Sequence, residues 1–142
     1  FDLAVGADGL LWVPNPGQHR LEGYTLARER VSAWGEASFG ITGFCGCCNP
    51  AHFALFNDGR VVTSEKGLPR VKVYSARGNF AGVVAGTERF AAYVDQPKAG
   101  PVDLAVAADR LGRVWVADPR AGVVRQFNPR QPGSANPQKP PA

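Results

Sequence analysis

Residues 52–80, HFALFNDGRVVTSEKGLPRVKVYSARGNF, decide the fold of this chain. They contain, in order, an apolar run, an Asn-Asp-Gly turn at 57–59, a β-branched run at 61–63, a Gly/Pro loop and the alternating segment 70–74. Apolar residues at every second position, separated by turns rich in Gly, Pro and Asn, are typical of short antiparallel β-strands. The stretch therefore predicts a unit of strand, turn, strand, loop and strand.

This unit occurs three times, near residues 1–35, 52–85 and 102–128. The first copy starts with Asp-Leu-Ala-Val and continues with Leu-Leu-Trp-Val at 10–13, while the third starts with the same four residues and continues with Val-Trp-Val-Ala-Asp at 114–118. A repeat of about fifty residues with several short strands per copy indicates the blades of a β-propeller. We therefore expect an all-β domain over residues 1–128 and an extended or disordered proline-rich tail over 129–142.

The motifs Asp-Leu-Ala-Val and Trp-Val-Ala-Asp, together with Asn-Pro-Gly-Gln-His-Arg-Leu at 15–21, resemble the NHL repeat. The resemblance covers most of residues 1–128, although only the first copy keeps the His19-Arg20 pair. It implies about three four-stranded antiparallel blades, and rings in this family usually have six. It also implies protein interaction or ligand capture at one face of the ring, with His19, Arg20 and Arg70 as candidate binding residues.

Three blades form only about half of such a ring, and an open arc leaves two apolar sheet faces uncovered. Either the sequence is part of a longer chain, or a second copy closes the ring, or another protein subunit covers the open ends. A start at Phe1 in a sequence without Met fits a processed or incompletely represented product.

Composition narrows the range of partners and compartments. The net charge is +4, but the Lys and Arg residues are scattered, which argues against a nucleic-acid partner. No apolar run approaches 18 residues, so no transmembrane helix is expected. Because bacterial propellers of the type it resembles are commonly exported, a periplasmic or extracellular location is favoured.

All three cysteines, Cys45, Cys47 and Cys48, precede the central repeat, and His52 follows them. In one interpretation these four residues bind zinc, copper or an iron-sulfur cluster, because thiolates are soft ligands. In a second interpretation two cysteines form a disulfide, most simply Cys45 with Cys48. In a third they are small buried residues beside the central channel.

Other sequence features give little indication of catalysis. No Gly-rich phosphate loop, nucleophile elbow or His-Glu-x-x-His motif is present. Glu65 and Asp118, at equivalent strand ends, are expected to serve turn and capping hydrogen bonds. Arg70 and Lys72 alternate with valines, which predicts a solvated strand face.

We therefore predict a non-catalytic binding or scaffolding module that mediates protein interaction within a larger assembly. The alternative is a metal-binding or redox protein that uses the Cys-rich loop at 45–52. A propeller hydrolase or lyase is the third hypothesis, for which His19, His52 and a few carboxylates are available.

Overall fold

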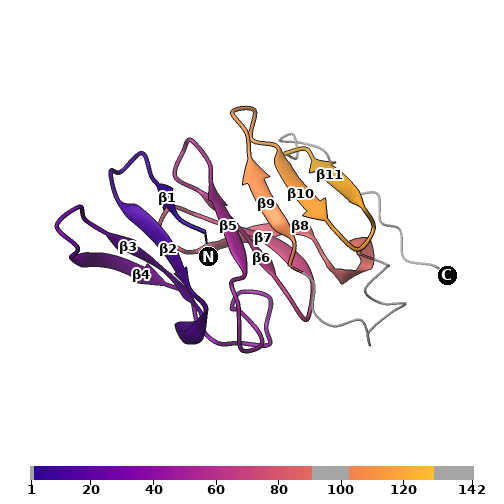
Figure 1. Ribbon diagram of the computed structural model, residues 1–142, viewed down its shortest axis with the longest axis horizontal. Helices are drawn as coiled ribbons and strands as arrows, with labels where there is room; N and C mark the ends of the chain where they lie inside the picture. The colour runs from indigo at the N-terminus through magenta and orange to yellow at the C-terminus, as the bar shows by residue number, and fades with distance from the viewer. Residues whose placement is uncertain (1, 91–102, 130–142) are drawn as a thin grey trace.

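The computed structural model describes residues 2–90 and 103–129. In these ranges the chain forms three antiparallel sheets that follow one another along the sequence (Figure 1). Blade 1 consists of β1 (Ala4–Val5), β2 (Leu11–Asn15), β3 (Arg20–Tyr24) and β4 (Arg30–Trp34); blade 2 of β5 (His52–Leu55), β6 (Val61–Glu65), β7 (Arg70–Tyr74) and β8 (Phe80–Ala85); and blade 3 of β9 (Ala105–Ala108), β10 (Val114–Asp118) and β11 (Val123–Phe127).

This architecture confirms the prediction of an all-β chain built from three repeated antiparallel blades. Strands that are consecutive in sequence pair with each other in all three sheets, which is the up-and-down order of a propeller blade. Blades 1 and 2 have four strands, and the described residues supply three for blade 3. Nearly all of the predicted tail at 129–142 lies outside the described residues. Two short 3-10 helices, Pro16–Gln18 and Thr87–Arg89, are the helical elements of the described ranges, and neither could span a membrane.

The hairpin between the first and second strand has similar chemistry in each blade. An aspartate beside the turn accepts backbone hydrogen bonds, and a glycine there adopts a positive φ that other residues avoid. In blades 1 and 3 the same aspartate also accepts the indole N–H of a tryptophan, from Trp12 to Asp8 at 3.1 Å and from Trp115 to Asp109 at 3.0 Å. The glycines are Gly9, Gly59 and Gly112, with φ of 76°, 82° and 74°.

Two apolar layers join the blades. Blade 1 packs on blade 2 through Trp12, Leu21, Phe53 and Val61. The opposite face of blade 2 packs on blade 3 through buried residues of both sheets and of the segments that follow β8 and precede β9: Phe56, Val62, Val71, Ala85, Phe90, Leu104, Val114 and Val116. Each sheet thus uses one face for each neighbour, as the alternation of side chains along a strand requires.

The two faces that point away from the array are open. On blade 1, Leu3 and Val5 are 69% and 68% exposed, and on blade 3, Val124 is 66% exposed. Ala4 of β1 and Phe127 of β11 pack against the layers between the blades, so Val5 and Val124, which point to the opposite sides of their strands, lie on the sheet faces where a further blade would pack.

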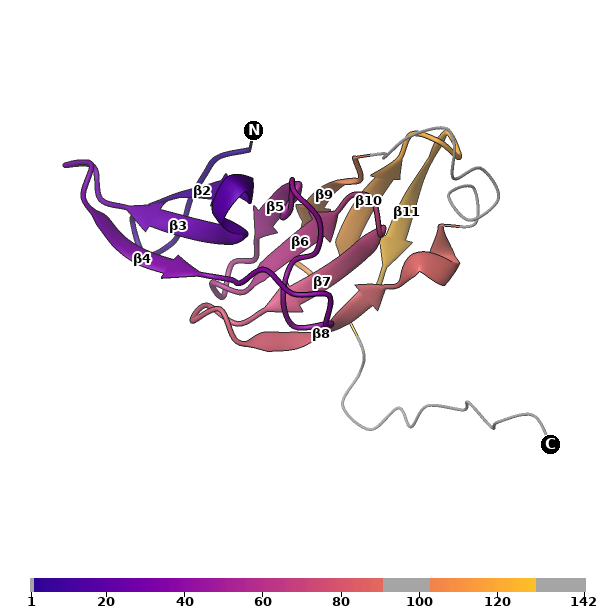
Figure 2. The same ribbon diagram turned by 90° about the horizontal axis from the view of Figure 1, so that it is seen from below.

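The segment between β4 and β5 does not take a direct route. Residues 36–49 cross over β6 and β7 on the side of blade 2 that faces blade 1 (Figure 2). The crossing begins at Gly35, which has a φ of 115° and whose missing Cβ would lie 2.6 Å from the His19 carbonyl oxygen. Only glycine fits this position, because both the backbone angle and the close approach exclude a side chain.

Candidate functional site

The functional groups named from the sequence gather at one edge of the blades. In an up-and-down sheet, the residues that precede the first strand lie at the same edge as the turn between the second and third strands. The hydrogen bond from Ala51 N–H to Ser64 O, at 2.9 Å, shows this directly in blade 2. This edge carries Asp2, His19, the Cys loop at 45–49, His52, Lys66 and Asp103.

Asp2 and His52 form a carboxylate–imidazole pair between blades 1 and 2. His52 Nδ1 lies 3.0 Å from Asp2 Oδ2, and the Phe53 N–H donates to the same oxygen at 3.1 Å. An ionised carboxylate accepts the proton of Nδ1 and leaves Nε2 as the basic nitrogen. No hydrogen bond to Nε2 is formed by the described residues, and the His52 side chain is 24% exposed. This arrangement orients one basic nitrogen at an accessible position, as general acid–base catalysis requires.

Ser64 lies opposite His52 in the register of β5 and β6. A serine beside a histidine that contacts an aspartate suggests a catalytic triad, but Ser64 is fully buried and its hydroxyl has no hydrogen-bond partner among the described residues. A nucleophile must reach both its base and the substrate. The geometry therefore gives an Asp–His pair and not a Ser–His–Asp triad.

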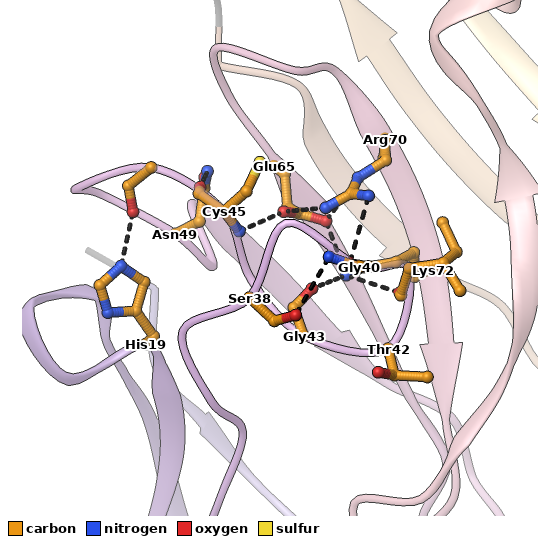
Figure 3. Close-up of polar contacts among 12 residues, drawn as sticks. His19, Ser38, Gly40, Thr42, Gly43, Cys45, Asn49, Glu65, Arg70 and Lys72 are labelled. Atoms are coloured by element: carbon orange, nitrogen blue, oxygen red, sulfur yellow. Dashed lines mark hydrogen bonds and ion pairs between the residues drawn. The ribbon is translucent and has the colours of Figure 1, made fainter.

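The Cys loop is held by backbone contacts on both sides (Figure 3). The Cys45 N–H donates to Glu65 Oε2 at 3.0 Å, and the Asn49 side chain contacts the Cys45 carbonyl and both backbone polar groups of Lys66. From blade 1, His19 Nε2 lies 2.6 Å from the Gly46 carbonyl and donates to it. These contacts fix the loop between the two blades.

The four predicted metal ligands are only partly brought together. Cys47 and Cys48 have their Sγ atoms 3.2 Å apart, whereas Cys45 is buried on its own and His52 is paired with Asp2. Within residues 2–90 and 103–129, no group of three or more His, Cys, Asp or Glu side chains is placed to hold a metal ion. All three thiols are free, which does not fit the Cys45–Cys48 disulfide, and a metal centre of these four residues stays a prediction.

A buried charge cluster lies under the crossing segment, in the close-up of Figure 3. Glu65 accepts hydrogen bonds from Arg70 Nε at 3.0 Å and Nη2 at 2.8 Å, and Lys72 Nζ lies 2.7 Å from Glu65 Oε1. Lys72 also donates to the carbonyls of Ile41 and Gly43. Burial lowers the pKa of Lys72, and the neighbouring Glu65 opposes this effect.

The prediction that Arg70 and Lys72 lie on a solvated face is therefore wrong. Lys72 is 0% and Arg70 6% exposed, because residues 36–45 cover this side of β7. The covering segment comes from about thirty residues earlier in the chain, so the local alternation of charged and apolar residues carries no sign of it.

Blades 1 and 3 have ion pairs of their own, within the third strand, β3, of blade 1 and between the second and third strands, β10 and β11, of blade 3. In blade 1, Glu22 accepts from Arg20 Nε at 2.6 Å and from Tyr24 Oη at 2.6 Å. In blade 3, Asp118 accepts the Ala121 N–H at 3.1 Å, which is the expected turn contact, and also pairs with Arg125 at 3.0 Å. Asp118 thus serves an ion pair as well as the expected turn, whereas the contacts of Glu65 are with Arg70, Lys72 and the Cys45 N–H.

The three predicted binding residues have separate partners. His19 contacts the Cys loop, Arg20 pairs with Glu22 on the open face of blade 1, and Arg70 is buried against Glu65. Their role in binding stays a prediction.

The Asp2–His52 pair was not predicted from the sequence. Asp2 stands just before the first strand of blade 1, and His52 is the first residue of the first strand of blade 2.

Comparison with known proteins identifies the fold. No family model matches the chain, and no curated protein matches it either, so membership of the NHL family is not shown. Among solved structures, the chain is similar to virginiamycin B lyase from Staphylococcus aureus, with a TM-score of 0.55 and 13% identity over 94% of this chain. It is similar also to a catalytically inactive histidine-to-alanine variant of that lyase with quinupristin, with a TM-score of 0.54 and 12% identity over 94% of this chain.

The chain spans 42% of the length of each of these structures. The prediction of a non-catalytic scaffolding module is contradicted, because the solved structures that share the fold belong to an enzyme and none of these findings supports a scaffold. At this level of identity the likeness establishes the architecture and nothing finer. The chain thus has an all-β, propeller-like fold of three consecutive antiparallel blades, shared with virginiamycin B lyase.

Proposed function

We propose that the chain carries part of the acid–base site of a propeller lyase, with His52 as the residue that moves the proton. The observation that carries the proposal is the Asp2–His52 pair, at 3.0 Å, on the edge where the blades present their connecting segments. The fold supports it, because a lyase has the same arrangement of blades and a histidine variant of that lyase is described as inactive.

The chemistry of elimination suits one oriented imidazole. His52 Nε2 takes a proton from carbon, the electrons of that C–H bond form a double bond, and the bond to the leaving group breaks with its electrons on that group. The imidazolium then returns the proton to the leaving group, so His52 acts first as base and then as acid. Asp2 stabilises the imidazolium and keeps the ring in position, and the Phe53 N–H keeps the carboxylate in position.

We infer also that further blades, from a longer chain of which this sequence is a part, from a second copy or from another polypeptide, cover the two open faces. Leu3 and Val5 are exposed in blade 1, but the residues at the equivalent positions of blades 2 and 3 pack against the preceding blade. Covering these faces would bring the connecting segments of further blades beside the edge that carries His52. The completed assembly is therefore the form in which activity should be measured.

The test uses quinupristin as the probe, with conversion followed by mass spectrometry. The protein should convert the probe, and His52→Ala should lose conversion by about 10²-fold or more, as is usual for a general acid–base residue. His19→Ala is the matched control, because it removes the other histidine of the chain and leaves the Asp2–His52 pair intact. Absence of conversion by the completed assembly, or equal rates for assemblies that carry the His52→Ala and His19→Ala variants, would refute the proposal.

A further inference from the structure

Cys47 and Cys48 form a pair of thiols outside the proposed acid–base site. Their Sγ atoms are 3.2 Å apart, Cys47 is exposed and Cys48 is half-buried. Adjacent cysteines often direct their sulfurs to different sides of the chain. Here Gly46, with a φ of 76°, bends the backbone just before the pair.

The loop holds the pair in place from both ends. On one side Cys45 is fixed by its N–H contact with Glu65, and His19 from blade 1 contacts the Gly46 carbonyl. On the other side Asn49 is buried and is hydrogen-bonded to the backbone of Cys45 and Lys66. A ligand that needs both sulfurs therefore meets a pair that is already arranged, which reduces the entropic cost of binding.

The sulfur separation indicates which kind of centre the pair suits. Adjacent Cα atoms lie about 3.8 Å apart across a trans peptide, below the usual range of about 4.4–6.8 Å for disulfides. A disulfide between Cys47 and Cys48 would therefore be strained and easily reduced. A tetrahedral zinc site takes about four ligands, and within residues 2–90 and 103–129 no third His, Cys, Asp or Glu side chain is placed to join the pair. A pyramidal soft centre, with bond angles close to a right angle, brings its sulfurs closer together than zinc does.

We propose that Cys47 and Cys48 form a two-thiol binding site for trivalent arsenicals. An arsonous acid, R–As(OH)₂, forms two As–S bonds with the pair and releases two molecules of water. The two hydroxyl groups on arsenic leave with the two thiol protons, and arsenic remains trivalent, so no oxidant or reductant takes part. Cys45 is no part of this site, because its sulfur is buried apart from the other two.

The experiment uses the full chain and phenylarsine oxide, which is an arsonous acid in its hydrated form, with intact-mass spectrometry under non-denaturing conditions. We expect one adduct per chain, and loss of one thiol should lower affinity by about 10²-fold or more because chelation is lost. Cys47→Ser and Cys48→Ser should each lose the adduct, while Cys45→Ser is the matched control and should keep it. A small dithiol in excess should remove the arsenical, and an equal concentration of a monothiol should not.

Three results would overturn the proposal. One is the absence of an adduct at millimolar phenylarsine oxide, and another is an adduct that survives in the Cys47→Ser variant. The third is an adduct that is lost equally in the Cys45→Ser variant while its circular dichroism spectrum is unchanged, since this would mean a three-cysteine centre. Because Cys47 is exposed, its serine variant should fold normally, and the same spectrum checks this.

Discussion

Replacing Glu65 by alanine should destabilise the protein more than any exposed ion-pair substitution in the chain. The Glu65 side chain is 0% exposed and is the shared partner of Arg70 and Lys72, which are themselves 8% and 0% exposed. Removing it leaves two cations in the interior and takes away the acceptor of the Cys45 N–H. Breaking a buried ion pair from one side typically costs about 3–5 kcal/mol.

Asp58→Ala is the matched control for this substitution. Asp58 also pairs with an arginine, Arg60, at 2.7 Å, but both side chains are about half exposed. An exposed pair of this kind contributes about 0–1 kcal/mol, and the Arg60 N–H contact with Asp58 at the turn contributes about 1 kcal/mol. Urea unfolding followed by fluorescence should therefore show a loss at least about 1 kcal/mol larger for Glu65→Ala than for Asp58→Ala.

Two further measurements separate the charge effect from loss of packing. Adding Lys72→Met to the Glu65→Ala variant should restore part of the stability, because it removes one of the two unpaired cations. Hydrogen exchange of the Cys45 amide should become faster in Glu65→Ala and stay unchanged in Asp58→Ala. Equal losses of stability in the two single variants would refute the conclusion that residues 36–45 are held by a buried ion pair.

Two more predictions concern the turns of the blades. Gly78→Ala should loosen blade 1 from blade 2, because the new Cβ would lie 2.3 Å from Trp34 Cγ, whereas Gly9→Ala has the same kind of backbone, with a φ of 76°, and open space around it. Gly9→Ala should cost about 1–2 kcal/mol in unfolding experiments and Gly78→Ala clearly more, and equal costs would contradict the proposed contact with Trp34. Hydrogen bonds, led by that from the Trp115 indole, lower the pKa of Asp109 from its ordinary value of 3.8 to about 2. Its contribution to stability is therefore complete above pH 4 and is lost as the pH falls toward 2, so Asp109→Asn should flatten the acid-unfolding curve in that window, and an unchanged slope would contradict this.

The blades could be predicted from sequence because their causes are local. Alternating apolar residues and a Gly turn in each copy specify strands and hairpins within about twenty residues of each other. The repeat at about fifty residues then specifies that neighbouring copies stack. For the same reason, blades 1 and 2 have the four antiparallel strands that the sequence predicts, paired in the order in which they follow one another along the chain.

The buried charges and the acid–base pair could not be predicted in the same way because their causes are non-local. Arg70 and Lys72 have the alternation of a solvated strand, and only the path of residues 36–45 shows that they are covered. Asp2 and His52 are fifty residues apart. Their positions just before or at the start of adjacent first strands are a usable signal, since such positions meet at one edge of a propeller.

The cysteine loop is an intermediate case. Its position before the central blade was clear from the sequence, but the sequence does not show which sulfurs meet. The structure places Cys47 against Cys48 and buries Cys45 separately. The difference depends on the bend at Gly46 and on the contacts of Asn49, which local spacing does not reveal.

The measurement that tests the central claim most directly is nitrogen NMR of the protein labelled at histidine. The chain has only His19 and His52, so the His19→Ala variant assigns every imidazole signal. With the imidazoles neutral, His52 should carry its proton on Nδ1, held by Asp2, and Asp2→Ala should shift the proton toward Nε2. A His52 ring protonated mainly on Nε2 in the unmodified protein, or a tautomer that does not respond to Asp2→Ala, would contradict the acid–base assignment.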